Sequence, residues 1–240
     1  MARHSKWHKV KQFKGAIDAK RSASFTKLAR EITVAARDKG ADPAMNAALG
    51  VAIERAKKAS MPKDSIERAV QRGAGGGAEG QIDSLTYEAY APGGTALLIE
   101  CLTDNRNRSA NDVKHILSEH GAALANAGAV TYLFDRFGVV RVTGGLPAHH
   151  REETELALID AGATDIVDGE DSADVRCMPN DLSMVTAAVQ QRGFSIESSE
   201  FEWIPKALIE TNEEIGIEVS GLIEELEAHD DVSRVYSNLA

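Results

Sequence analysis

The strongest constraint on the fold is a change of sequence pattern at a glycine-rich segment, residues 73–80 (GAGGGAEG). Before it, apolar residues recur at the spacing of amphipathic helices; after it, short apolar runs typical of strands alternate with helical patterns. The segment lacks the preceding strand and the Gly-Lys-Ser/Thr ending of a phosphate-binding loop. We therefore expect a flexible linker between a helical N-terminal region and an α/β region.

Three helices with short connections are expected before the linker. The first starts near Ser22 or Ser24 and ends at Gly40, with a core stripe of Phe25, Leu28, Ile32 and Ala35. Asn46 is expected to cap the second helix, and Pro62 fits the first turn of the third, which runs to Gly73. These helices predict a small bundle.

The α/β region alternates short strands and helices. Strands are expected at residues 84–89, 95–102, 129–134, 139–143, 165–168, 174–178, 195–201 and 232–237, and helices at 110–120, 152–161, 182–192 and 212–229. Residues 138–202 alone read β-α-β-β-α-β, the ferredoxin-like order. We therefore predict an α+β protein with a helical domain (1–78), a discontinuous α/β domain (79–136 plus 203–240) and a ferredoxin-like domain inserted in it (137–202).

Charge is distributed unevenly along the chain. The whole sequence has a formal net charge of −10, yet residues 1–80 hold 17 basic and 8 acidic residues, and residues 81–240 hold 10 basic and 29 acidic residues. A basic segment on an acidic protein indicates an anionic partner for that segment. The alternative is that these charges form an ordinary solvated surface.

Several classes of protein are not supported by the sequence. No run of about 18 apolar residues is present, so a membrane span is not expected. The N-terminus lacks the apolar stretch of a secretory signal. The two cysteines, Cys101 and Cys177, lie far apart in expected strands, which favours buried thiols in the reducing cytoplasm over a disulfide or metal site. Neither a cofactor nor an obligatory small molecule is expected.

Residues 1–20 form a basic arm in which lysines two or three residues apart can follow a phosphate backbone. Trp7 can stack on an unpaired base or anchor the arm to the bundle. On the following helix, basic side chains fall roughly opposite the apolar stripe, where we expect them to face solvent. The candidate nucleic-acid-binding residues are Lys6, Trp7, Lys9, Lys11, Lys14, Lys20, Arg21, Lys27, Arg30 and Arg37.

The second candidate site is a polar cluster after the strand expected at 95–102, made of Asp104, Asn105, Arg106, Asn107 and Arg108. Two arginines beside a helix N-terminus can bind phosphate or carboxylate. The alternative is a turn in which Asp104 and Asn105 satisfy backbone groups and Ser109 caps the helix. No catalytic motif supports an enzyme, although this cluster is where an active site would lie.

Motifs along the whole chain resemble those of the YebC family. They include Met1–Trp7, Phe25–Leu28, Glu31–Arg37, Met61–Asp64, Tyr87-Glu88, Pro92–Gly94, Glu100–Arg108, Tyr132–Arg136, Glu202–Pro205 and Val235–Asn238. The resemblance implies a helical domain and two α/β domains, one inserted in the other, and no enzymatic activity. It also implies either DNA-binding transcriptional regulation, as bacterial members are commonly labelled, or a translational role, as in the mitochondrial activator of cytochrome oxidase synthesis and in ribosome-associated bacterial members.

From the residues and the resemblance together we expect a non-enzymatic, cytoplasmic regulator that binds nucleic acid. RNA of the ribosome is the preferred partner, with the arm and first helix contacting phosphates and Arg106 and Arg108 making a second contact or a domain–domain bond. DNA binding in transcriptional control is the first alternative, and an enzyme with its site near Asp104–Arg108 is the second.

Overall fold

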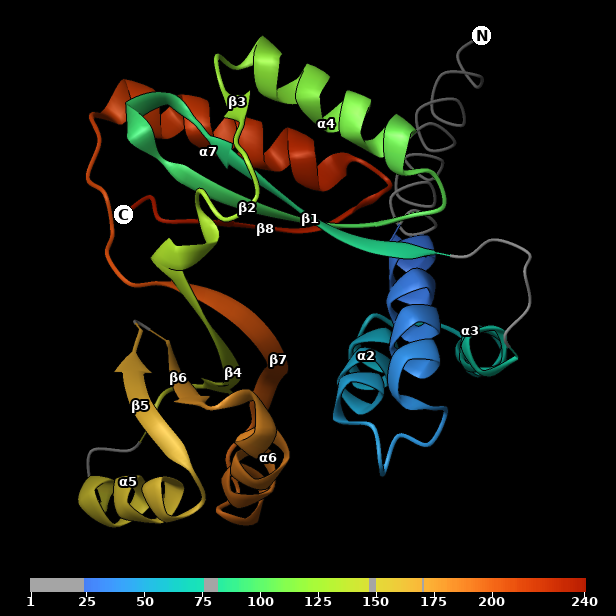
Figure 1. The fold of residues 1–240 in the computed structure, drawn as a ribbon. Coiled ribbons are helices and arrows are strands. Elements are labelled where there is room, and N and C mark those ends of the chain that lie inside the picture. The colour runs from blue at the N-terminus through green and yellow to red at the C-terminus, as the bar shows by residue number, and fades with distance from the viewer. Residues whose placement is uncertain (1–23, 76–81, 147–149, 170) are drawn as a thin grey trace, which may run out of the picture. The chain divides into compact units, whose positions relative to one another are not determined.

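The computed structural model describes residues 24–75, 82–146, 150–169 and 171–240 (Figure 1). The chain forms two compact units. The first contains the chain up to Tyr87, Ile99–His120 and Ser220–Val235; the second contains Glu88–Leu98, Gly121–Val219 and Tyr236–Ala240. The expected fold class is confirmed: helices come first, and two four-stranded sheets with their helices follow. The expected boundaries of the three domains stay a prediction.

The helical part of the first unit consists of residues 24–39, called here the N-terminal helix, with α2 (Ala47–Lys58) and α3 (Lys63–Ala74). Its core contains Leu28, Ile32, Leu49 and Ile66, all less than 10% exposed. The Asn46 side chain accepts a hydrogen bond from the Leu49 amide (3.1 Å), which confirms it as the cap of α2. Such a cap satisfies one of the amides that a helix start leaves unpaired.

The glycine-rich segment begins later than predicted. Gly73 is buried inside α3, and a Cβ at this position would overlap the Thr33 carbonyl oxygen and lie 2.7 Å from the Ala36 Cβ. Gly73 therefore lets α3 pack closely against the N-terminal helix, a helix–helix contact that a sequence pattern does not reveal. Residues 76–80 of the predicted linker lie outside the described residues.

The first sheet has the order β3-β1-β2-β8, formed by β1 (Asp83–Tyr90), β2 (Ala96–Thr103), β3 (Ala123–Leu124) and β8 (Val232–Ser237). Strand β2 is buried along nearly its whole length, as its apolar run predicts. Helix α4 (Arg106–Glu119) lies beside the C-terminal half of α7 (Glu213–Ala228) (Figure 1). The end of β2, the start of β8 and the start of α4 meet within the first unit, because the Leu102 amide donates to the Asp231 carbonyl (2.8 Å) and Arg108 bonds to the Asp231 side chain.

The second sheet has the order β5-β6-β4-β7, formed by β4 (Phe134–Thr143), β5 (Ala163–Asp168), β6 (Ser172–Cys177) and β7 (Ile196–Pro205). All three pairings are antiparallel, and α5 (Arg151–Asp160) and α6 (Leu182–Gln191) connect and cover the strands. This β-α-β-β-α-β order and sheet arrangement confirm the ferredoxin-like prediction.

One predicted strand is wrong. Residues 131–133 form a short 3₁₀ turn, and β4 starts only at Phe134. The buried Glu88 carboxylate accepts hydrogen bonds from the amides of Gly128 (2.6 Å), Val130 (2.5 Å) and Thr131 (2.8 Å). Because a side chain about 40 residues away satisfies these amides, the segment needs no strand partner.

Candidate nucleic-acid interface

The whole of the predicted basic arm, residues 1–20, lies outside the described residues. Lys6, Trp7, Lys9, Lys11, Lys14, Lys20 and Arg21 all precede the first described residue, and their role in nucleic-acid binding stays a prediction. The described candidates are Lys27, Arg30 and Arg37 on the N-terminal helix and the cluster from Asp104 to Arg108.

The three candidate cations of the N-terminal helix, Lys27, Arg30 and Arg37, have partners within the first unit, which the helical wheel did not predict. Lys27 Nζ donates to the Glu227 carbonyl (2.6 Å), and Arg37 Nη1 donates to the Ile82 carbonyl (2.5 Å). Burial is the main cause that lowers the pKa of Lys27, and it outweighs the nearby acidic charges. These side chains therefore help to hold the helix against the rest of the unit.

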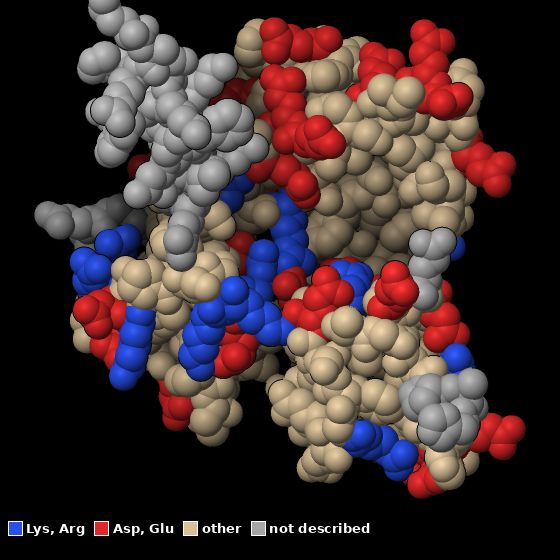
Figure 2. All heavy atoms as spheres, turned by 180° about the vertical axis from the view of Figure 1, so that it is seen from behind, with Lys and Arg blue, Asp and Glu red and all other residues tan. Residues whose placement is uncertain are grey.

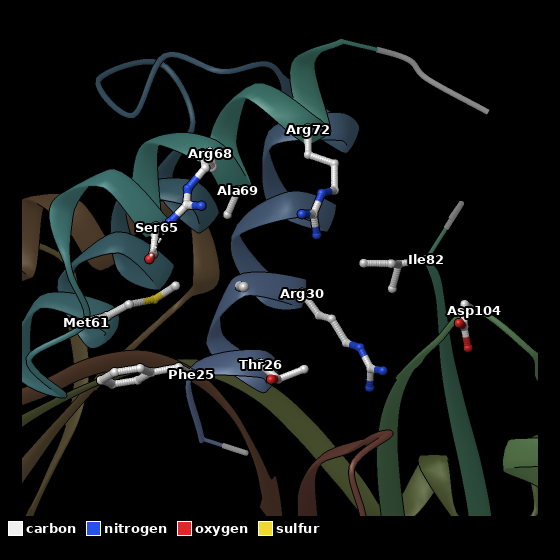
Figure 3. Close-up of a pocket in the computed structure, with 11 residues that line it drawn as sticks. Phe25, Thr26, Arg30, Met61, Ser65, Arg68, Ala69, Arg72, Ile82 and Asp104 are labelled. Carbon is white, nitrogen blue, oxygen red and sulfur yellow. Dashed lines mark hydrogen bonds between the residues drawn. The ribbon is translucent and has the colours of Figure 1, made fainter. Parts of the chain in front are cut away.

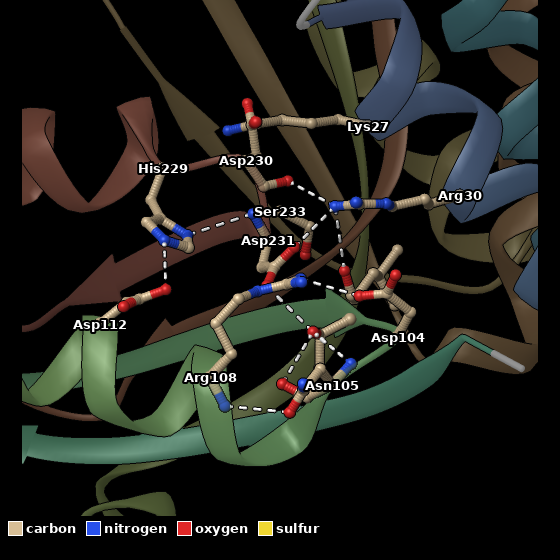
Figure 4. A network of polar contacts seen from close by, with 12 residues as sticks. Lys27, Arg30, Asp104, Asn105, Arg108, Asp112, His229, Asp230, Asp231 and Ser233 are labelled. Carbon is tan, nitrogen blue, oxygen red and sulfur yellow. Dashed lines mark hydrogen bonds and ion pairs between the residues drawn. The ribbon is translucent and has the colours of Figure 1, made fainter. Parts of the chain in front are cut away.

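Arg30 takes part in a polar network of the first unit (Figure 4). Its Nη1 donates to Asp231 Oδ1 (2.9 Å), to the Asp230 carbonyl (2.9 Å) and, less closely, to the Leu102 carbonyl (3.4 Å). Asp231 is 2% exposed and lies between α7 and β8. A carboxylate buried to this degree requires compensation by charged or hydrogen-bonding partners.

Two further side chains complete the network around Asp231. Its Oδ2 accepts hydrogen bonds from the Thr103 hydroxyl (2.9 Å) and from Arg108 Nη2 (2.9 Å). Burial acts to raise the pKa of Asp231, but the hydrogen bonds from Arg108 and Thr103 and the charges of Arg108 and Arg30 outweigh it, so the pKa is lowered. Asp231 therefore connects the N-terminal helix, β2 and α4.

The predicted cluster of Asp104–Arg108 is present, but its capping residue differs from the prediction. Asn105, not Ser109, caps the helix, since its side chain accepts from the Arg108 amide (3.1 Å). Helix α4 consequently starts at Arg106 rather than near Ala110, and Ser109 is buried inside its first turns. Asn107 is exposed.

Both arginines of this cluster are matched by carboxylates of the same unit. Arg106 donates through Nε and Nη2 to Asp83 (2.7 and 3.1 Å), and these bonds with the Asp83 charge raise the pKa of Arg106. Arg108 is shared between Asp104 (2.8 Å) and Asp231. Asp83, Asp104 and Asp231 all belong to the α/β domain predicted at 79–136 plus 203–240, so these bonds lie within that domain. The domain–domain bond and the second nucleic-acid contact expected of these arginines both stay predictions.

Histidines near this network make pairwise contacts. His229 Nδ1 accepts from the Asp231 amide (3.2 Å), which leaves Nε2 to face Asp112 (3.3 Å) (Figure 4). His120 faces Glu225 at 2.8 Å. Within the described parts of the chain, His, Cys, Asp and Glu side chains form no group of three suited to a metal ion.

Surface charge differs between the helical part and α7. In Figure 2 most of the visible Lys and Arg lie over the helical part, where some Asp and Glu lie among them. Helix α7 contains six glutamates and no basic residue. Because phosphates are repelled by such a surface, an anionic partner is expected at the helical part. Among the described helices, none is long and apolar enough to cross a membrane.

Sequence reasoning missed two features. Asp231 gave no local signal, because its partners lie about 120 to 200 positions earlier in the chain. Arg68 and Arg72, one turn apart on α3, line a groove with Arg30. The spacing of these arginines beside the apolar residues of α3 could have predicted an exposed pair of cations. The groove itself could not be predicted in this way, because its facing wall comes from the N-terminal helix.

Comparisons with known proteins cover the chain from end to end. A model described as the TACO1/YebC protein N-terminal domain matches residues 5–76, and one described as the TACO1/YebC second and third domain matches residues 82–239. Proteins named "Probable transcriptional regulatory protein" from Rubrobacter xylanophilus and Thermobifida fusca are 45% and 46% identical, with 99% of this chain and 95% of each relative covered.

A solved structure agrees with these matches. The crystal structure of a conserved hypothetical protein from Aquifex aeolicus is similar to this chain, with a TM-score of 0.84 and 39% sequence identity. The alignment covers 93% of this chain and 92% of the Aquifex protein.

Proposed function

The chain belongs to the TACO1/YebC family, and from this premise we propose that it is a nucleic-acid-binding regulator of gene expression that acts on translation through ribosomal RNA. It acts by binding rather than by catalysis. The helical N-terminal part contacts the nucleic acid, and the acidic α/β part stays away from the phosphates and orients the protein.

The observation that carries this proposal is the segregation of charge. The 17 basic residues within positions 1–80 outnumber the acidic ones about two to one, whereas α7 has no basic residue at all. A protein with net charge −10 is repelled by nucleic acid at long range unless its cations are gathered on one part. Gathered cations release counterions from phosphates, so binding is expected to weaken steeply as salt increases.

The network around Asp231 supports a positioning role for the Asp104–Arg108 cluster. It connects the N-terminal helix to β2, α4 and β8, so this helix has a fixed place within the first unit. A helical part held in place in this way avoids the entropic cost of ordering it on binding.

The experiment that tests this function is a fluorescence anisotropy titration with three labelled probes: a single-stranded RNA, a structured ribosomal RNA fragment and a random DNA duplex. We expect the two RNAs to bind more tightly than the duplex at near-physiological salt, with affinity falling as salt rises. Replacing Lys9, Lys11 and Lys14 by Ala should weaken binding and reduce the salt dependence; an unchanged salt slope would count against a role for these lysines.

The names of the curated relatives favour a second candidate, a DNA-binding transcriptional regulator. Sequence-specific regulators bind their sites about 10³-fold or more tightly than other DNA. The test is therefore whether genomic DNA fragments selected by the protein bind about 10³-fold more tightly than random duplex. Such a preference would replace the RNA proposal, and equal binding of selected and random DNA would remove the transcriptional one.

A further inference from the structure

A groove lies between the N-terminal helix and α3, with a volume of about 680 Å³ (Figure 3). All of its lining residues belong to the first unit. The volume falls within the range of small-ligand pockets, about 300–1,000 Å³. None of the features described above accounts for this groove, and its lining combines cations with apolar side chains.

The cations on the α3 side are Arg68 and Arg72, one helical turn apart, and both reach into the groove in Figure 3. Arg68 Nε donates to the Asp64 carbonyl (3.1 Å) and its Nη2 to the Ser65 hydroxyl (3.2 Å). These two bonds orient the guanidinium and leave three of its five N–H groups available. Within the part of the chain that the structure describes, Arg72 has no hydrogen-bond or ion-pair partner.

This lack of carboxylate partners distinguishes the pair from other arginines of the unit. Arg30 faces Asp231, Arg55 faces Glu31 and Arg106 faces Asp83, each within 3 Å. Arg68 and Arg72 are the arginines of the groove whose charge the described chain leaves unmatched. Two guanidinium groups one turn apart are well suited to bind the oxygens of one phosphate or of neighbouring phosphates.

The floor of the groove is apolar. Met61, Ala69 and Ile82 are each less than 10% exposed, and Phe25 and Ala29 are partly buried beside them. A free phosphate or a simple dicarboxylate makes no favourable contact with such a floor. A nucleotide does, because its base presents a flat apolar face that can pack on the floor while its phosphate is held to one side.

One acidic residue, Asp104, also lines the groove. It is paired with Arg108 (2.8 Å), which compensates part of its charge, but it still disfavours a phosphate beside it. In Figure 3 it lies beyond Ile82, away from Arg68. The charges therefore favour one direction for a bound nucleotide, with its phosphate at the α3 side.

We propose that this groove binds one unpaired nucleotide of a single-stranded RNA, with the phosphate on Arg68 and Arg72 and the base on the apolar floor beside Phe25. The proposal rests on the proposed function, because it names the part of the helical region where RNA is held. Base-paired nucleotides are excluded, since in a duplex the base faces are stacked and unavailable.

The test compares two double variants of the full chain by anisotropy with a labelled single-stranded RNA. One is Arg68→Ala with Arg72→Ala. The matched control is Lys57→Ala with Lys63→Ala, which removes the same charge from α2 and α3 at two exposed lysines that do not line the groove. Circular dichroism checks whether both variants remain folded.

We expect the arginine variant to lose about tenfold in affinity and its salt slope to fall by about 1, while the lysine control changes far less. A third variant, Phe25→Leu, keeps an apolar side chain without an aromatic face and should weaken RNA binding without changing the salt slope. An RNA containing 4-thiouridine should crosslink to the peptide that carries Phe25 or Met61.

The outcomes separate the two proposals. If wild-type protein binds RNA but the arginine and lysine variants lose affinity equally, or the crosslink maps elsewhere, the groove proposal is wrong and the proposed function stands. If wild-type protein binds only duplex DNA, or no nucleic acid, both proposals are wrong.

Discussion

Replacing Asp231 by Asn tests the network that holds the N-terminal helix. The carboxylate accepts hydrogen bonds from Arg30, Thr103 and Arg108, each at 2.9 Å, and is 2% exposed. The amide keeps the size of the side chain, but it loses the charge and turns one acceptor into a donor facing a donor. Hydrogen bonds to charged groups contribute about 1.5–3 kcal/mol each, and the arginines are partly exposed, so we expect a total loss of about 3 kcal/mol.

For a chain of this size, that loss lowers the melting temperature by about 6–12 °C. The measurement is thermal and urea unfolding followed by circular dichroism at pH 7, with hydrogen exchange to locate the change in the first unit. Asp230→Asn is the matched control, because Asp230 is exposed and contributes its backbone carbonyl rather than its side chain. A change within about 0.5 kcal/mol is expected for this control.

The same variant has a defined pH dependence. The pKa of Asp231 is lowered in the folded protein. Its contribution to the free energy of unfolding is therefore complete above the pKa of the unfolded state, about 3.9, and is lost as pH falls through the pKa of the folded state. The difference in free energy of unfolding between wild type and Asp231→Asn should therefore be full at pH 5–7 and should shrink as pH falls below about 4. Equal stability of wild type and Asp231→Asn at pH 7 would refute this account of the network. So would a loss of stability in Asp230→Asn as large as that in Asp231→Asn.

Three further predictions concern packing and buried groups. Gly73→Ala should destabilise the protein by about 2–3 kcal/mol in urea unfolding, because the new Cβ overlaps the Thr33 carbonyl; unchanged stability would contradict the close helix packing. Glu88→Gln should speed hydrogen exchange in residues 128–131 by removing an acceptor of three amides, and unchanged exchange would argue against this role. Burial raises the pKa of Cys101 to about 12 and of Cys177 to about 11, so neither thiol should react with iodoacetamide at pH 8 until the protein unfolds; fast labelling of the native protein would contradict their burial.

Local signals in the sequence were sufficient for much of the fold. Asn46 was identified as a cap because its side-chain oxygen acts within three residues, and residues 232–237 form β8 as predicted. The β-α-β-β-α-β order of residues 138–202 was visible because each element has its own apolar period.

Interactions between distant residues were not predictable in the same way. Residues 129–134 were predicted as a strand because nothing near them shows that Glu88 binds their amides. Asp231 stood next to another Asp in a short turn, and only the fold brings Arg30, Thr103 and Arg108 to it. For the candidate site, the basic character of the N-terminal region was predictable, whereas the groove depends on how two helices pack.

The most direct test of the proposed function is co-sedimentation of the full-length protein with ribosomes from a lysate, at low and at near-physiological salt, beside the variant with Lys9, Lys11 and Lys14 replaced by Ala. The account predicts that wild-type protein sediments with ribosomes at both salts and that the variant is released at the higher one. Absence of the wild-type protein from ribosomes at both salts, with duplex DNA bound instead, would contradict it and favour transcriptional control.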